Sequence, residues 1–243
     1  MTQLYEPGLN VGLQLLELLA LIALAALVSR RVPNLRTVAL AIVILAVAHM
    51  ALFVGLLVKT PLHWNWIGKL LSIGVTFAAI AMLPSIGWRD AGFTSNQHGG
   101  LKPAILAAAI VCLFAWGTNV LLSGGLHFTV PTFETLLYQA TMPGFNEEPL
   151  YRGLALVLID RAFGDVKIGM LGARIGWGAC ITSVWFGLIH GNGFEKGHFQ
   201  FALAIVVIIA IVGFGLAWIR ERTQSLALGI ATHNVVNIGQ QFI

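Results

Sequence analysis

Three charged residues lie within six positions of one another in a stretch that is otherwise mostly apolar. They are Glu147, Glu148 and Arg152, in the run Ala140-Thr-Met-Pro-Gly-Phe-Asn-Glu-Glu-Pro-Leu-Tyr-Arg-Gly153. On a helix Glu148 and Arg152 share a face, which is the spacing of an internal ion pair. Glu147 points about 100° away from its neighbour and has no basic partner in its own segment. It must therefore find a partner on another helix or carry a proton, and a buried carboxyl group of this kind is a candidate general base.

Two later segments add polar residues to apolar surroundings. The run Ser183-Val-Trp-Phe-Gly-Leu-Ile-His190 ends in a single histidine. Further on, His233 and Asn237 are four residues apart, so on a helix they lie one above the other. Both side chains can donate hydrogen bonds to the same small group. This pair suits an oxyanion site.

Together these residues form an inventory for the attack of water on a carbonyl group. Glu147 is the base candidate, imidazoles can orient a water molecule, and His233 with Asn237 can stabilise the developing oxyanion. Neither Gly-x-Ser-x-Gly nor His-Glu-x-x-His occurs in the sequence, and no Ser or Cys stands in an evident nucleophile motif. The pattern favours amide hydrolysis without a covalent intermediate.

The elements that must position these residues are membrane helices. Of the 243 residues 58% are hydrophobic and 10% are charged, and the mean hydropathy is +0.86. Such a chain cannot cover itself with polar surface. Apolar runs near the length that crosses a bilayer cover residues 9–29, 37–58, 65–84, 102–123, 133–160, 174–192, 199–219 and 224–241. We predict an all-α, polytopic membrane helix bundle with about eight transmembrane helices.

We expect residues 1–243 to form a single transmembrane domain, with scaffold helices in 1–128 and the helices that carry the motifs in 129–243. Pro143 and Gly144 predict a broken or frayed helix just before the carboxylate pair, which is tolerated at membrane depth only against protein or a water-filled cavity. Lys69 is expected to snorkel to the interface. His49 and Glu17 are expected to be packed or hydrogen-bonded polar residues.

The basic residues indicate topology rather than nucleic-acid binding, although the formal charge is +4. The even-numbered connections hold only Lys59 and Lys196. The odd-numbered connections hold Arg30, Arg31, Arg36, Arg89, Lys102, Arg161, Lys167, Arg174, Arg220 and Arg222. This bias places the odd connections in the cytoplasm and both termini outside. We expect an integral multi-pass protein of a prokaryotic cell membrane, with membrane lipids as partners.

The three motifs Glu147-Glu148-x-x-x-Arg152, Phe186-x-x-x-His190 and His233-x-x-x-Asn237 resemble the boxes of the CPBP family, the CAAX proteases and bacteriocin-processing enzymes. They occur in the family's order, and the resemblance covers roughly residues 130–243. It implies that Glu147 is the catalytic base, that His190 helps to activate water, and that His233 with Asn237 forms the oxyanion site. Glu148 and Arg152 would then support this arrangement.

The resemblance leaves the cofactor and the substrate open. We favour a metal-free, glutamate-type intramembrane endopeptidase, but two imidazoles with one or two carboxylates could also ligate zinc. The substrate implied is a protein or peptide at the membrane, either prenylated or otherwise membrane-associated. The topology raises a question about the prenylated class, because prenylated CAAX ends are made in the cytoplasm whereas His190 is predicted toward the outer side.

Two other functions compete with the protease. Buried carboxylates and histidines also build proton relays in proton-coupled transporters, although the sequence shows no internal repeat. A non-catalytic bacteriocin-immunity or regulatory membrane protein could retain the same fold.

Overall fold

The computed structural model describes residues 2–95 and 100–243. Its helices are α1 (Thr2–Ser29), α2 (Leu35–Gly55), α3 (Trp66–Met82), α4 (Leu101–Ser123), α5 (Phe133–Glu147), α6 (Leu156–Ala162), α7 (Trp177–Gly191), α8 (Leu203–Thr223) and α9 (Ala227–Gln240). A π-helix, η1 (Glu148–Ala155), joins α5 to α6 without a break. The described chain thus has eight helical segments, each over one of the predicted apolar runs. The predicted class, an all-α membrane helix bundle, is confirmed.

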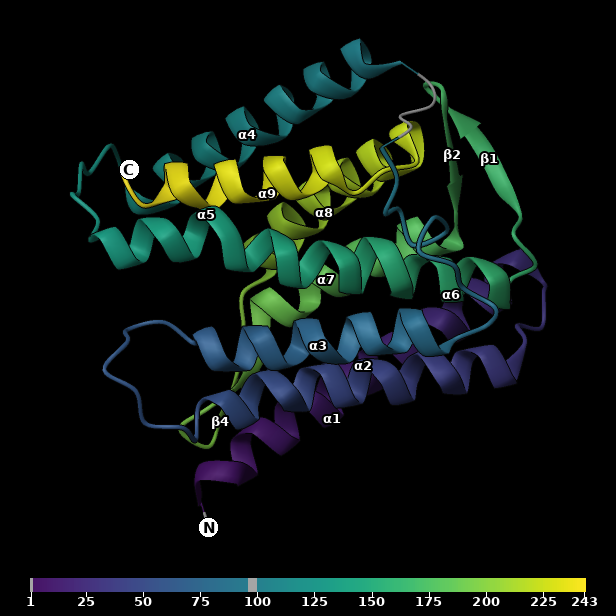
Figure 1. Ribbon diagram of the computed structural model, residues 1–243, viewed down its shortest axis with the longest axis horizontal. Helices are drawn as coiled ribbons and strands as arrows, with labels where there is room; N and C mark the ends of the chain where they lie inside the picture. The colour runs from purple at the N-terminus through teal and green to yellow at the C-terminus, as the bar shows by residue number, and fades with distance from the viewer. Residues whose placement is uncertain (1, 96–99) are drawn as a thin grey trace.

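Four helices in the described residues are long and apolar enough to cross a membrane. They are Glu6–Ser29 within α1, together with α2, α4 and α8, and α3 is a shorter apolar helix. In Figure 1 both termini and the connections after α2, α4 and α7 lie at the left end of the bundle, and the other connections lie at the right end. The odd-numbered connections, which carry most of the basic residues, therefore share one end. Which end faces the cytoplasm stays a prediction.

Two short β-hairpins replace the ends of two predicted helices. Strands β1 (Lys167–Met170) and β2 (Ala173–Gly176) pair antiparallel, as do β3 (Asn192–Glu195) and β4 (His198–Phe201). Both hairpins turn through two residues with positive φ, which is the geometry of a tight hairpin turn. The predicted segments 174–192 and 199–219 began too early, because an apolar strand that leads into an apolar helix is not separated from it by hydropathy.

Each hairpin is fixed by polar contacts to the helices. Lys167 Nζ lies 2.9 Å from Asp160 Oδ2 and 2.9 Å from Glu221 Oε2, which ties β1 to α6 and α8. Burial alone would lower the pKa of Lys167, but the two carboxylates outweigh it and raise that pKa. The second hairpin is tied to α1, where Asn192 Nδ2 donates to Glu17 Oε1 at 2.5 Å. The prediction that Glu17 is a hydrogen-bonded polar residue is confirmed.

The centre of the bundle packs around η1. Leu18 of α1, Leu45 of α2, Leu150 of η1 and Trp185 of α7 are fully buried in one apolar cluster. Every residue of η1 is buried, so this segment is surrounded by other helices. The motif residues on it are consequently held in the protein interior.

The helix is not broken at Pro143 and Gly144, contrary to the prediction. Helix α5 continues through Pro143 to Glu147. A Cβ on Gly144 would lie 2.5 Å from Asn234 Oδ1 and 2.7 Å from Ile230 O, so the glycine lets α9 approach closely. The Gly144 N–H donates to Asn234 Oδ1 at 2.8 Å. A side chain of a neighbouring helix thus satisfies a backbone group here, which is how membrane helices tolerate proline.

Candidate active site

A cavity of about 420 Å³ lies among α3, α5, α7, α8 and α9 and contains most of the predicted site residues. Its polar lining includes Glu147, His190, His233 and Asn237, together with Lys69. We call it the site cavity. The structure therefore brings residues of all three motifs together around a single space, whereas Glu148 and Arg152 lie outside its lining.

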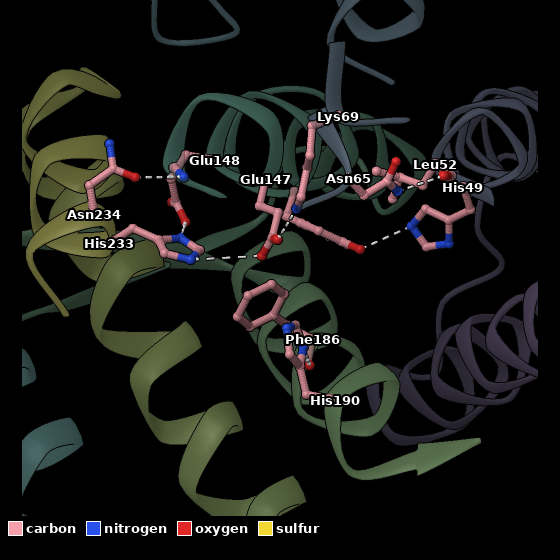
Figure 2. A network of polar contacts seen from close by, with 12 residues as sticks. His49, Leu52, Asn65, Lys69, Glu147, Glu148, Phe186, His190, His233 and Asn234 are labelled. Carbon is pink, nitrogen blue, oxygen red and sulfur yellow. Dashed lines mark hydrogen bonds and ion pairs between the residues drawn. The ribbon is translucent and has the colours of Figure 1, made fainter. Parts of the chain in front are cut away.

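Glu147 is held by a lysine from the N-terminal half of the chain. Lys69 Nζ of α3 donates to Glu147 Oε1 at 2.5 Å, and the two side chains are 13% and 15% exposed. The other carboxylate oxygen, Oε2, lies 3.7 Å from His233 Nε2. Figure 2 shows the Glu147 carboxylate between the Lys69 ammonium and the His233 ring. The prediction that Lys69 snorkels to the interface is wrong, because its ammonium is paired inside the bundle with the Glu147 carboxylate.

Glu148 and Arg152 form the predicted ion pair behind the cavity. Arg152 Nη1 donates to Glu148 Oε1 at 3.1 Å, and both side chains are fully buried. The guanidinium also donates from Nη2 to Gly213 O at 3.3 Å and lies 4.3 Å from the centre of the Phe186 ring. Arg152 therefore connects η1, α7 and α8. Its side chain is fully buried, so it can hold these helices in position but cannot contact a substrate.

The same Glu148 oxygen orients His233. His233 Nδ1 lies 2.7 Å from Glu148 Oε1, and a carboxylate only accepts, so this ring nitrogen carries a proton. Nε2 is consequently turned toward Glu147 and the site cavity. A carboxylate–histidine contact of this kind fixes both the orientation of the ring and the position of its proton.

His190 is oriented by its own helix. Its Nδ1 donates to Phe186 O at 2.7 Å, because a carbonyl only accepts, and the Phe186 ring lies 4.4 Å from the His190 ring. Nε2 of a neutral ring is then a free acceptor. The side chain is exposed and lines the site cavity, so its free nitrogen is accessible to water. The Phe186-x-x-x-His190 spacing thus serves to bring both the carbonyl and the ring to the histidine.

A known protein family matches the part of the chain that carries the three motifs. The family model described as Rce1-like, type II CAAX prenyl endopeptidase Rce1-like, matches residues 130–239. We call residues 130–239 the Rce1-like region. The match confirms the resemblance seen in the three motifs, all of which lie inside it. No curated protein and no solved structure matches the sequence.

The Rce1-like region indicates a CAAX-type membrane protease that acts on a protein or peptide. One residue that contacts the motifs lies outside this region. Lys69 lies on α3, more than sixty residues before the region begins, yet it contacts Glu147 directly. The helices of the N-terminal half therefore contribute a charged group to the lining of the site cavity.

A π-helix positions the first motif of the Rce1-like region. It begins at Glu148, next to Pro149, which has no N–H to donate. π-helical turns are rare and occur frequently at functional sites. Here the wider turn still leaves Glu148 in contact with Arg152, and it places Glu147 at the junction between α5 and η1.

Sequence reasoning missed Lys69 and Asn234 as neighbours of the site. The sequence does mark Lys69, because a lone lysine in an apolar segment needs either the membrane interface or a buried partner. Only the assumption of a buried partner would have placed Lys69 at the site. Asn234 stands next to His233, but its role is to accept the Gly144 N–H, which depends on the packing of α5 against α9. Asn237, in contrast, lines the site cavity as predicted.

The donors of the site do not fit a zinc centre as they are arranged. No group of three or more His, Cys, Asp and Glu side chains in the described residues is placed to hold a metal ion. One Glu147 oxygen is held by an ammonium, although the Nδ1 contacts of the two histidines are of the kind that zinc-bound histidines also make. A catalytic zinc site needs three protein ligands around one open position.

Proposed function

We propose that this protein is a metal-free intramembrane endopeptidase in which Glu147 activates a water molecule for attack on a peptide bond. The observation that carries the proposal is that Glu147, His190, His233 and Asn237 line one cavity inside a membrane helix bundle. Ionisable residues in such a place are costly and therefore mark a function. The Rce1-like match supplies the class of reaction.

In the proposed reaction, water lies between the Glu147 carboxylate and Nε2 of His190. The water oxygen bonds to the carbonyl carbon of the peptide, and a water proton passes to Glu147. The carbonyl oxygen becomes an oxyanion, which accepts hydrogen bonds from Asn237 and from His233 Nε2 when that ring carries both protons. The C–N bond then breaks, and the proton held by Glu147 passes to the leaving amine. The products are a carboxylic acid and an amine.

Lys69 and the Glu148–Arg152 pair are positioning residues in this account. The Lys69 ammonium fixes one oxygen of Glu147, so the other oxygen is directed to the space beside His233. Glu148 holds Nδ1 of His233, and Arg152 pairs with Glu148 in a fully buried place. Each of these residues acts through another side chain.

The substrate that fits is a peptide segment at the membrane. Ile208, Ile209, Val212 and Leu216 form an apolar side of the site cavity, and apolar walls with a few polar groups are typical of specific binding sites. Either a prenylated or another membrane-associated peptide meets this requirement.

The metal-free mechanism is supported by the lysine. An ammonium bonded to Glu147 repels a divalent cation from the same carboxylate. Metal analysis of the purified protein and cleavage in the presence of a chelator test this step. We expect less than one zinc per ten chains and cleavage that is unchanged by chelation. Stoichiometric zinc with loss of cleavage on chelation would overturn the metal-free mechanism and leave the protease intact.

The function itself is tested with purified protein reconstituted in vesicles. The probes are quenched fluorescent peptide libraries, one with a farnesyl anchor, one with a palmitoyl anchor and one without an anchor. We expect cleavage of an anchored library, a loss of about 10²-fold or more in His190→Ala and His233→Ala, and no loss in the matched control His198→Ala. His198 lies in the exposed strand β4. Proton flux through the same vesicles without any cleavage would instead favour a carrier.

A further inference from the structure

A second, smaller cavity lies on the other side of Glu147 and His190. Its volume is about 150 Å³, and its polar lining consists of Gln14, His49 and Tyr151 with Glu147 and His190. These residues come from α1, α2, η1, the α5–η1 junction and α7. Glu147 and His190 line both this space and the site cavity. The two proposed catalytic side chains therefore stand between two cavities.

The polar groups of the second cavity form one network centred on His49. His49 Nδ1 lies 2.8 Å from Gln14 Oε1, and His49 Nε2 lies 2.9 Å from the Tyr151 hydroxyl. The amide oxygen only accepts, so Nδ1 carries the proton, and Nε2 of a neutral ring accepts from the Tyr151 O–H. The Tyr151 oxygen is left with its lone pairs for another donor. In Figure 2, His49 lies on the far side of Glu147 from His233.

Packing fixes this network in place. His49 is 3% exposed, and its ring stacks on Trp185 with centroids 5.3 Å apart. Trp185 Nε1 in turn donates to the backbone oxygen of Gln14 at 2.7 Å. The prediction that His49 is a packed, hydrogen-bonded residue is thus confirmed. Such fixed polar groups present a constant arrangement to whatever occupies the cavity.

The size and the chemistry of the second cavity both suit water. A water molecule needs about 10–15 Å³ of the space open to a water-sized probe, so a cavity of this volume holds several water molecules. Its lining offers the Glu147 carboxylate, the Tyr151 oxygen and the free nitrogen of His190, all of which accept hydrogen bonds. A buried water needs two to four polar partners, and these three groups provide them.

We propose that this second cavity stores the water consumed by the reaction and delivers it to Glu147 from the α1–α2 side, opposite the peptide. Tyr151, held by His49, is a positioning residue for the attacking water. The use of this water in catalysis rests on the proposed function. The presence of the water is argued from the geometry of the cavity alone. We call this space the water cavity.

The first test needs no activity. X-ray hydroxyl-radical footprinting of the purified native protein oxidises side chains that lie beside internal water. We expect Tyr151 to be oxidised at a rate within about threefold of Tyr138, which lines the site cavity, and well above Phe163, which is 3% exposed in the apolar cluster. Oxidation of Tyr151 as slow as that of Phe163 would overturn the inference whatever the enzyme does.

The second test separates the water from the peptide by kinetics. Tyr151→Phe removes one oxygen, and the loss of one hydrogen bond to the attacking water corresponds to a three- to tenfold fall in kcat with KM unchanged. The matched variant Tyr138→Phe alters the site cavity and should change KM rather than kcat. An unchanged kcat in Tyr151→Phe, or a change confined to KM, contradicts the inference.

The two tests also distinguish the failure of this inference from the failure of the proposed function. If native protein cleaves no anchored peptide but Tyr151 is oxidised rapidly, the water cavity stands and the peptidase falls. If native protein cleaves and Tyr151 stays unoxidised, the water reaches Glu147 by another route.

Discussion

Removal of Arg152 is the perturbation for which the structure gives the clearest magnitude. Arg152→Met deletes the contact with Glu148 Oε1 at 3.1 Å, the bond to Gly213 O at 3.3 Å and the stacking on Phe186 at 4.3 Å. The Glu148 carboxylate is fully buried and keeps His233 as its hydrogen-bond donor. Breaking a buried ion pair by removing one partner costs about 3–5 kcal/mol, which lowers Tm by about 6–20 °C in a chain of this size.

Thermal unfolding in detergent, followed by tryptophan fluorescence, measures this change. The matched control is Arg161→Met, because Arg161 pairs with Asp90 at 2.9 Å with both side chains partly exposed, and such a pair is worth less than about 1 kcal/mol. In the double variant Glu148→Leu with Arg152→Met the uncompensated charge is gone, so Tm should rise above that of Arg152→Met. Activity should not return, since His233 has lost its acceptor.

Either of two results would show that Arg152 does not compensate a buried charge on Glu148. A Tm of Arg152→Met within the range of the Arg161→Met control would mean that Glu148 is not left as a buried, unpaired charge. A double variant less stable than the single variant would mean that the carboxylate itself stabilises the bundle.

Three further predictions concern residues around the site and the hairpins. Lys69→Met should lower kcat/KM by at least tenfold, because Glu147 loses the ammonium that fixes its orientation, while the exposed control Lys196→Met should keep native activity in the same cleavage assay. Asn234→Ala should lower stability by about 1–3 kcal/mol, because a buried backbone N–H loses its acceptor, and thermal unfolding reports this loss. Lys167→Met should be less stable than the native chain. Folding raises the pKa of Lys167, so the stability difference should persist below its unfolded pKa of about 10.4. The difference should disappear only as the pH rises through the folded pKa of Lys167. A difference in unfolding temperature that vanished between pH 7 and 9 would contradict the last prediction.

Much of the fold could be predicted because the membrane restricts the choices. An apolar run of about twenty residues has to be helical in lipid, and each predicted run overlaps one helical segment of the described chain. Hydropathy failed at the two hairpins, where Ala173–Gly176 and His198–Phe201 are strands. It also failed at Pro143, because the contact between α5 and α9 that keeps the helix intact is a property of packing rather than of local sequence.

Contacts of the candidate site could be predicted where the two residues are close together in the sequence. Glu148 and Arg152 are four residues apart and meet as expected. The partner of Glu147 was not predictable, since Lys69 is 78 residues away in sequence, and neither was the network of His49, Gln14 and Tyr151 across three helical segments. One sequence without a structure does not place such distant residues beside each other.

The central claim is that Glu147 is the base of an intramembrane peptidase, and the cleavage rate of Glu147→Gln tests it most directly. The variant is compared with native protein and with Glu195→Gln, a matched change at an exposed carboxylate of the β3–β4 hairpin. The account predicts that Glu147→Gln folds with the same far-UV circular dichroism, binds the anchored peptide, and cleaves it at least 10²–10⁴-fold more slowly, whereas Glu195→Gln cleaves at the native rate. Cleavage by Glu147→Gln at a rate within tenfold of the native protein would contradict the account.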